Sequence, residues 1–324
     1  MKIDPRKVLS ETLPPLGIEM VGFSDPMMRP TFLPSERARG RVVYTPIFPG
    51  IALSHARYLG EYLTIRHEDG PSRLAVEYCT YGRAGWKLRG GSVLYYGAQD
   101  LLFHRIDLCA DSRVSLPLGY YESYTFLLDL DILARECPPL AQQGGFSAQA
   151  IDQRYCMCSK PVAIPADAEV MHIFEDLNDL DERDRPAAYE RKAQELLLFL
   201  SHAHATPRPE LPPYAALQTN AVQQVHDTMT ANLRRRFTIE TLSQDSGLNA
   251  STLKSVFKAM YGLPIATYMK EYRIRRAQQL LRDTDASIAE VAATVGYETQ
   301  GKFANTFRII VGAPPTEYRR AVRG

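Results

Sequence analysis

Two stretches of the sequence, offset by 50 residues, place polar and cationic side chains on one face of an expected helix. Apolar residues fall between these side chains at spacings of three and four, which predicts one buried and one exposed face. Hydroxyl, amide and ammonium groups on an exposed helix face can hydrogen-bond with the edges of nucleic-acid bases. The candidate base-reading residues are Ser251, Lys254, Ser255, Gln300, Lys302 and Asn305.

A second group of cations lies beside these stretches and suits phosphate groups better than bases. Lys258 and Arg308 follow on the same expected helices, and Arg234, Arg235 and Arg236 precede Phe237. Phosphate contacts position a protein on a duplex without reading its sequence. The arginine run has an alternative role, because cations also complete the C-terminal end of a helix.

The candidate residues belong to a pattern that occurs twice. Ile239, Leu242 and Gly247 recur 49 residues later, and further positions recur 50 residues later, namely Phe257, Gly262, Pro264 and Tyr268 as Phe307, Gly312, Pro314 and Tyr318. Thr238 and the Ser287/Glu290 capping box start the first helix of each copy, and glycine ends it. Each copy therefore predicts a helix-turn-helix, whose second helix lays its N-terminal part in the major groove.

Between the copies, residues 265–282 predict one continuous helix with apolar residues that can pack against both. Eighteen residues span about 27 Å at the rise of an α-helix. Successive major-groove faces on one side of B-DNA lie about 34 Å apart. One chain could therefore read two adjacent groove segments.

The stretch from Tyr268, "YMKEYRIRRAQQLLRDTDASIAEVAATVGYETQGKFANTFRIIVGAPPTEYRR", resembles the DNA-binding domain of AraC/XylS-type transcription regulators. The resemblance covers about the last hundred residues. It implies a regulator that binds double-stranded promoter DNA and that is usually an activator contacting RNA polymerase.

The sequence departs from this family's pattern in two places. Gly301 and Ala304 stand where members often carry base-reading side chains, so Gln300, Lys302 and Asn305 must make more of the base contacts. Ser243 and Ser246 stand where the second copy has Ala292 and Val295, which predicts a more polar core in the first copy.

Charge divides along the chain. From Thr219 onward there are 15 basic and 9 acidic residues, against 23 and 28 before it. A basic module gains affinity for DNA by releasing counterions, so its binding should weaken with salt. The start of the chain, "MKIDPRKVLSETLPP", lacks an apolar signal segment, and no long apolar run follows, which predicts a cytoplasmic protein with no membrane contact.

The expected fold class is α+β with two domains. Short runs rich in β-formers predict a small barrel or jelly roll over about residues 41–130, and helices follow over about 167–204. The resemblance to AraC-type regulators implies that this part is their cupin-like β-barrel sensor. These helices can pack on the barrel or form a homodimer contact, as the family commonly does there. We expect a sensor and dimerisation domain at residues 1–205, a proline-rich linker at 206–216 and the DNA-binding domain at 217–324.

A barrel of this kind can hold a small-molecule effector. Aromatic and imidazole side chains in or beside the strands are candidates for lining such a pocket, although plain core packing is the commoner role: Tyr44, Tyr58, Tyr62, Tyr78, Trp86, Tyr95 and His104. The segment "LAVEYCTYGRAGWKLRGGSVLYYGAQDLLF" is similar to the sensor of the siderophore-responsive, pyochelin-regulator branch, which names no ligand for this chain.

Catalytic chemistry is not expected. The histidines are scattered, so no cofactor, metal ligand set or catalytic residue is predicted, and the spacing of Cys156 and Cys158 differs from that of CxxC motifs. We interpret the protein as a DNA-binding transcription regulator that responds to a ligand and activates transcription. Two alternatives stay open: an enzyme with an accessory DNA-binding domain, or a regulator whose barrel binds a protein.

Overall fold

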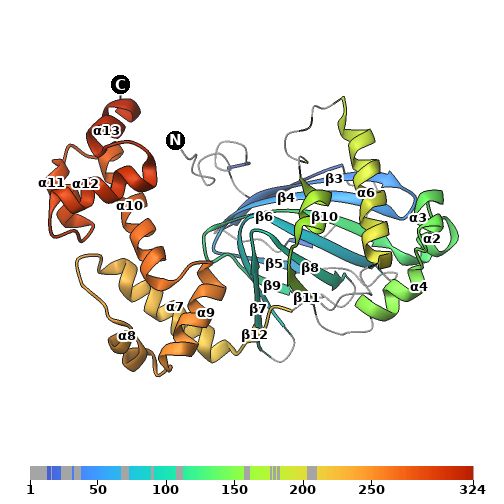
Figure 1. Cartoon of the computed structure of the whole chain (residues 1–324), viewed down its shortest axis with the longest axis horizontal. Coiled ribbons are helices and arrows are strands. Elements are labelled where there is room, and N and C mark those ends of the chain that lie inside the picture. The colour runs from blue at the N-terminus through green and yellow to red at the C-terminus, as the bar shows by residue number, and fades with distance from the viewer. Residues whose placement is uncertain are drawn as a thin grey trace. The chain divides into compact units, whose positions relative to one another are not determined.

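The computed structural model describes residues 13–15, 17–22, 31–32, 38–66, 73–88, 91–106, 112–156, 161–175, 177, 180, 183–202 and 210–323 (Figure 1). The chain divides into two compact units, one ending at Pro213 and the other beginning at Tyr214. Cys158 and residues 206–209 of the expected linker lie outside the described residues. None of the helices in the described ranges has the length and apolar character needed to cross a membrane.

The N-terminal unit is built from two sets of strands that share the long strand β6 (Arg73–Lys87). One set follows the order β1 (Gly17–Val21), β3 (Ala38–Phe48), β4 (Ile51–Gly60), β10 (Tyr120–Asp129), β6, β8 (Asp100–Arg105) and β11 (Val162–Pro165). The other follows the order β2 (Thr31–Phe32), β5 (Tyr62–Arg66), β9 (Ser112–Ser115), β6 and β7 (Val93–Gly97). β12 (Pro213–Tyr214) lies at the boundary of the units.

Strand β6 passes from one set to the other at Gly82. It pairs with β10 up to this residue and with β7 from Arg83 onward. Gly82 has a φ of +85°, and a Cβ there would lie 2.2 Å from the carbonyl oxygen of Tyr120. Only glycine therefore allows the strand to turn this close to its neighbour.

The side chains of β6 alternate between two faces, and both faces contribute to a core. Leu74, Val76 and Tyr78 face a core formed with the helices, and Cys79 faces a second core between the two strand sets. The unit is thus rich in sheet with helices on one face. The pairings in the described residues do not themselves establish a closed barrel, so the cupin-like barrel stays a prediction.

The helices of this unit cover the outer face of β4, β6 and β10. They are α2 (Leu130–Arg135), α3 (Pro139–Gln143), α4 (Ala148–Ile151), the π-helix η3 (Asp152–Cys156), α5 (Ala168–Phe174) and α6 (Arg185–His202). Ala193, Leu196 and Leu197 of α6 are fully buried in the same core as Phe126. Residues 167–204 were expected either to pack on the barrel or to form a dimer contact. The apolar face of α6 packs on the sheet.

The C-terminal unit is all helical. It contains α7 (Ala216–Ala231), α8 (Ile239–Ser246), α9 (Ala250–Tyr261), α10 (Ile265–Asp283), α11 (Ile288–Thr294), α12 (Gln300–Val311) and α13 (Pro315–Arg323). The predicted start signals are present, since Thr238 accepts from the backbone of Thr241 and Ser287 forms a capping box with Glu290. Helices α8–α9 and α11–α12 are the two predicted helix-turn-helix copies, joined by α10.

The first copy has the more polar core that was predicted. The Ser246 hydroxyl donates to the carbonyl of Ser243, 3.2 Å away, and Ser243 donates to the carbonyl of Leu248. Their counterparts Ala292 and Val295 are buried among apolar side chains of the second copy. The serines are tolerated because their hydroxyls are paired within the turn.

Candidate nucleic-acid interface

Helix α9 carries the first set of predicted contact residues. Asn249 caps it by accepting from the backbone N–H of Thr252 at 2.8 Å, and it ends at Gly262, whose φ is +82°. Its apolar stripe is buried, as predicted: Leu253, Val256, Phe257 and Met260. The opposite face exposes Ser251, Lys254, Ser255 and Lys258. Because the apolar stripe anchors α9 in the core of the domain, the polar face is free to contact another molecule without any change in that core.

Helix α12 carries the second set. Thr299 accepts from the backbone N–H of Lys302 at 3.3 Å, and Phe303 and Phe307 are fully buried. The exposed residues include the four expected to contact DNA: Gln300, Lys302, Asn305 and Arg308. Exposure agrees with their expected use, while their roles at base or phosphate stay predictions.

Three of these α12 residues, Lys302, Asn305 and Arg308, already have partners within the chain. Lys302 Nζ lies 3.0 Å from Glu298 Oε2, and Arg308 Nη2 donates to Asn305 Oδ1 at 3.4 Å. The Lys302 ammonium also holds the pKa of Glu298 below its usual range. Both contacts are exposed, so they cost little to exchange for contacts with DNA.

The arginine run lies in the turn between α7 and α8. Arg234, Arg235 and Arg236 are exposed, and the Arg235 guanidinium lies 4.9 Å from the centre of the Phe237 ring. Helix α7 ends at Ala231, so the run follows the helix rather than forming its last turn. Of the two roles considered, this placement favours phosphate contact.

The second helix-turn-helix copy packs against the segment between α7 and α8, in a contact that the sequence did not reveal. Arg273 of α10 donates from Nη2 to the carbonyl oxygen of Leu233 at 2.8 Å. The same carbonyl faces Gly296, where a Cβ would lie only 2.0 Å away. The turn of the second copy is therefore packed against the segment that leads into the first. Gly296 was recognisable in the sequence only as a helix end.

Residues 242–321 match a known family described as a helix-turn-helix domain. The chain is 30% identical over 132 residues to the transcriptional activator RhaR of Klebsiella pneumoniae, a match that covers 40% of this chain and 45% of RhaR. It is 25% identical over 111 residues to the transcriptional activator AarP of Providencia stuartii, covering 34% of this chain and 82% of AarP. The C-terminal unit is an AraC-type helix-turn-helix domain.

Solved structures similar to this AraC-type domain include the DNA-binding domain of AdpA in complex with a target DNA, at 27% identity and a TM-score of 0.30 over 31% of this chain and 91% of that one. Another is a transcriptional regulator of Chromobacterium violaceum with an AraC-type DNA-binding domain, at 26% identity and a TM-score of 0.29, covering 31% of this chain and 90% of that one. The chain spans under half of RhaR.

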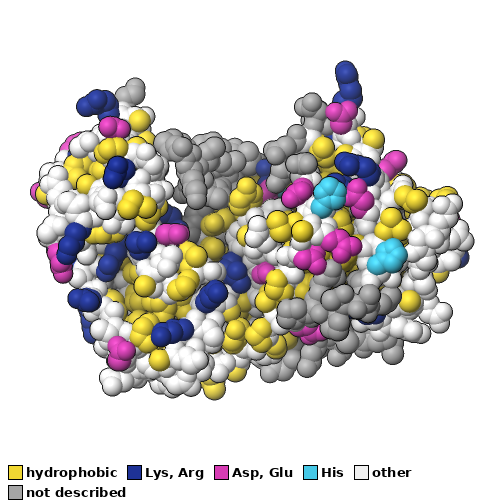
Figure 2. All heavy atoms as spheres, viewed as in Figure 1, with side chains coloured by type: hydrophobic (Ala, Val, Ile, Leu, Met, Phe, Trp, Pro, Cys, Tyr) yellow, Lys and Arg dark blue, Asp and Glu magenta, His cyan; other side chains and the backbone are white. Residues whose placement is uncertain are grey.

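The surface of the AraC-type domain is rich in cations. Figure 2 shows Lys and Arg side chains distributed over its visible face, with fewer Asp and Glu, whereas acidic side chains gather on the N-terminal unit. The charge division read from the sequence is therefore visible on the surface. Such a surface attracts polyanions and makes their binding depend on salt.

The residues expected to line a ligand pocket do not form one group. Tyr58 and Trp86 lie in the core between the strand sets, whereas Tyr78 lies in the core under the helices and stacks on Phe174 at 4.7 Å. The Trp86 and His104 rings meet edge to face at 4.7 Å. Tyr44 and Tyr95 are buried as well, and Tyr62 is half-buried. These seven residues stay a prediction as a pocket, and the cavity described below is lined by others.

Proposed function

We propose that the protein is a sequence-specific DNA-binding transcription regulator. The observation that carries this proposal is the pair of capped helices, α9 and α12, each with a buried apolar stripe and an exposed polar face, in one AraC-type domain. A domain that reads DNA twice needs two such helices held in a defined relation. The contact of Gly296 and Arg273 with Leu233, which holds the second copy against the segment leading into the first, supports such a relation.

In the proposed complex, the N-terminal turns of α9 and α12 enter adjacent major-groove segments of promoter DNA. Lys254 suits the acceptor edge of guanine, and Gln300 and Asn305 suit adenine. Lys258, Arg308 and the run from Arg234 to Arg236 would hold phosphates and set the register. The base contacts then decide which promoter is bound.

We further propose activation in response to a small-molecule effector. Two similar proteins are named transcriptional activators, which supports contact with RNA polymerase as the route of action. The strand-rich N-terminal unit is the candidate sensor. An effector can shift the regulator between states only by the difference in its affinity for them.

Selection of duplexes by the full chain from a random-sequence pool tests the proposal. Enrichment of one motif with two parts is expected, with affinity that falls steeply as salt rises. A variant of Lys87, an exposed cation of the N-terminal unit, is the matched control, and Lys87→Ala should select the same motif. Equal affinity for all duplexes would refute sequence-specific regulation.

A further inference from the structure

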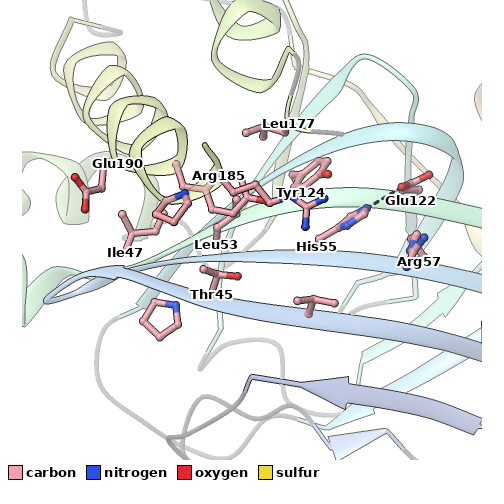
Figure 3. A pocket seen from close by; sticks show the side chains of 14 residues that line it. Thr45, Ile47, Leu53, His55, Arg57, Glu122, Tyr124, Leu177, Arg185 and Glu190 are labelled. Carbon is pink, nitrogen blue, oxygen red and sulfur yellow. Dashed lines mark hydrogen bonds and ion pairs between the residues drawn. The ribbon is translucent and has the colours of Figure 1, made fainter. Parts of the chain in front are cut away.

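A cavity of about 540 Å³ lies between the outer face of β3, β4 and β10 and the first turns of α6 (Figure 3). Its volume is in the range of sites that bind small organic molecules. It belongs to the N-terminal unit alone, and it lies on the opposite side of the sheet from the core between the strand sets. The sequence did not single it out.

The floor of the cavity is set by strand register. His55 of β4 is paired with Tyr124 of β10, and the next residue on the same face, Arg57, is paired with Glu122. The His55 and Tyr124 rings stack with centres 4.2 Å apart, and His55 Nε2 donates to Glu122 Oε1 at 2.7 Å. The imidazole is thus fixed in place, and the Glu122 carboxylate has a donor within the floor.

The roof comes from the start of α6. Arg185 donates from Nε to the carbonyl oxygen of Leu180 at 3.2 Å, which anchors its side chain. In Figure 3 this side chain reaches over the floor toward Tyr124 and His55. Burial raises the pKa of Tyr124, and the positive charges of Arg185 and Arg57 oppose that rise. Both guanidinium groups therefore act on the same end of the cavity.

The two ends of the cavity differ in chemistry. Arg57, Arg185 and His55 lie at the end of the cavity that contains Glu122, whereas Glu190 lies at the other end. The rest of the lining is mainly apolar or aromatic and includes Val43, Ile47, Leu53, Leu177, Pro186 and Tyr189. A guanidinium group recognises a carboxylate through paired hydrogen bonds, and aromatic rings favour a flat partner. The arrangement suits a ligand with a planar apolar body and one anionic end.

We propose that this cavity binds a small aromatic carboxylate, held by Arg185 and Arg57 at its anionic end and by Leu53, Tyr124 and Tyr189 along its ring. This inference rests on the proposed function only in that the ligand would be the effector of the regulator. A bound ligand would bridge β4 and β10 to α6, so it stabilises the folded unit by mass action.

Calorimetry and thermal unfolding of the full chain with three probes that share a naphthalene ring test the inference. The probes are 2-naphthoate, its neutral counterpart 2-naphthamide and the cationic 2-naphthylmethylamine. Saturable binding and a raised Tm are expected with naphthoate, and weaker binding with the amide and the amine. Absence of naphthoate binding, or equal binding of all three probes, would overturn the proposal.

Variants then assign the site. Arg185→Ala should raise the Kd for naphthoate about tenfold to a hundredfold, because it removes a charge-assisted contact. Arg57→Gln should weaken binding in the same direction. Arg191→Ala is the matched control, because Arg191 is on the same helix, 62% exposed, and outside the cavity lining. Its Kd should match that of the wild type, and an equal loss in Arg191→Ala would place the ligand elsewhere.

Circular dichroism without ligand separates loss of the site from loss of the fold. If Arg185→Ala does not fold, Arg57→Gln carries the assignment alone. Duplex selection is run on the same samples. Naphthoate binding without sequence-specific DNA binding would sink the proposed function and leave this site standing, whereas DNA binding without naphthoate binding would do the reverse.

Discussion

Lys254 and Arg308 represent two kinds of expected contact with DNA: Lys254 with a base and Arg308 with a phosphate. Lys254 lies in the second turn of α9, and Arg308 lies in the last turn of α12. Lys254→Ala should relax base preference at one or two positions, by about 1 to 3 kcal/mol if the contact is bidentate to guanine. Arg308→Ala should weaken all duplexes alike. Competition binding with single-base variants of the selected motif measures both, and a base-selective loss in Arg308→Ala would contradict its assignment to phosphate.

Glu298 restrains a predicted base reader in the free protein. Its carboxylate holds Lys302, and it adds a negative charge beside the proposed DNA surface. Glu298→Gln should therefore tighten DNA binding by up to about fivefold at low salt, and by less at high salt, where surface pairs are screened. Fluorescence anisotropy at two salt concentrations measures the change. Glu317→Gln, an exposed acid of α13, is the control, and an equal gain there would indicate a general charge effect.

His226 links the stability of the AraC-type domain to pH. Its ring stacks on Tyr261 at 4.4 Å, and Nε2 lies 3.0 Å from the Tyr268 hydroxyl. Burial lowers its pKa from the ordinary 6.5, with Asp227 opposing that effect. As pH falls below 6.5, the unfolded chain takes up the proton first, so stability is full above that pH and declines toward the lowered pKa.

The expected decline is at most about 1.4 kcal/mol per pH unit. Unfolding followed by circular dichroism at pH 7.5, 6.5 and 5.5 should show it in the wild type and not in His226→Gln. His172→Gln changes an exposed histidine and should keep the wild-type slope. A slope that survives in His226→Gln would assign the effect to other groups.

At the scale of elements, two glycines allow the cost of a left-handed backbone conformation to be compared with the cost of a steric clash. Gly247 and Gly296 end the first helix of each copy, with φ values of +67° and +83°. A Cβ at Gly247 would meet nothing within 4 Å, whereas one at Gly296 would strike the carbonyl of Leu233. Gly247→Ala should cost about 1 to 2 kcal/mol, which is the cost of a left-handed residue.

Gly296→Ala should cost more, roughly 3 kcal/mol or above, because the added methyl group must also displace Leu233. Chemical unfolding of both variants measures the difference. The same variant should lose more affinity for the complete DNA motif than for either half of it. Equal costs at the two glycines would show that the contact between Gly296 and Leu233 does not constrain the domain.

Local signals explain which elements could be predicted. Caps such as Thr238 and Ser287, and the apolar spacing of α9, α10 and α12, depend on residues within a few positions of one another. The contacts that could not be predicted join distant positions. His55 and Glu122 meet across 67 residues through strand pairing, and Arg273 reaches Leu233 across 40. A strand was expected across Leu53, His55 and Arg57, but nothing in the sequence indicated the cover from α6.

For the whole molecule, the length of α10 sets a limit on the DNA that one chain can read. Its 19 residues span about 28 Å, close to the 34 Å between successive major-groove faces. Since Arg273 and Gly296 hold the second copy against the segment that leads into the first, the two halves of the motif should lie about one helical turn apart. This spacing should be rigid.

Insertion of five base pairs between the halves turns one half to the opposite face of the duplex, and insertion of ten moves it about 34 Å further away. Both insertions should reduce the affinity of one chain to that of a single half-motif, as measured by anisotropy with stoichiometry. A flexible linker would instead tolerate the ten-base-pair insertion, because this insertion keeps both halves on the same face of the duplex and only increases the distance between them. Full affinity on that duplex would therefore contradict a rigid pair of reading helices, while leaving each helix free to read its own half.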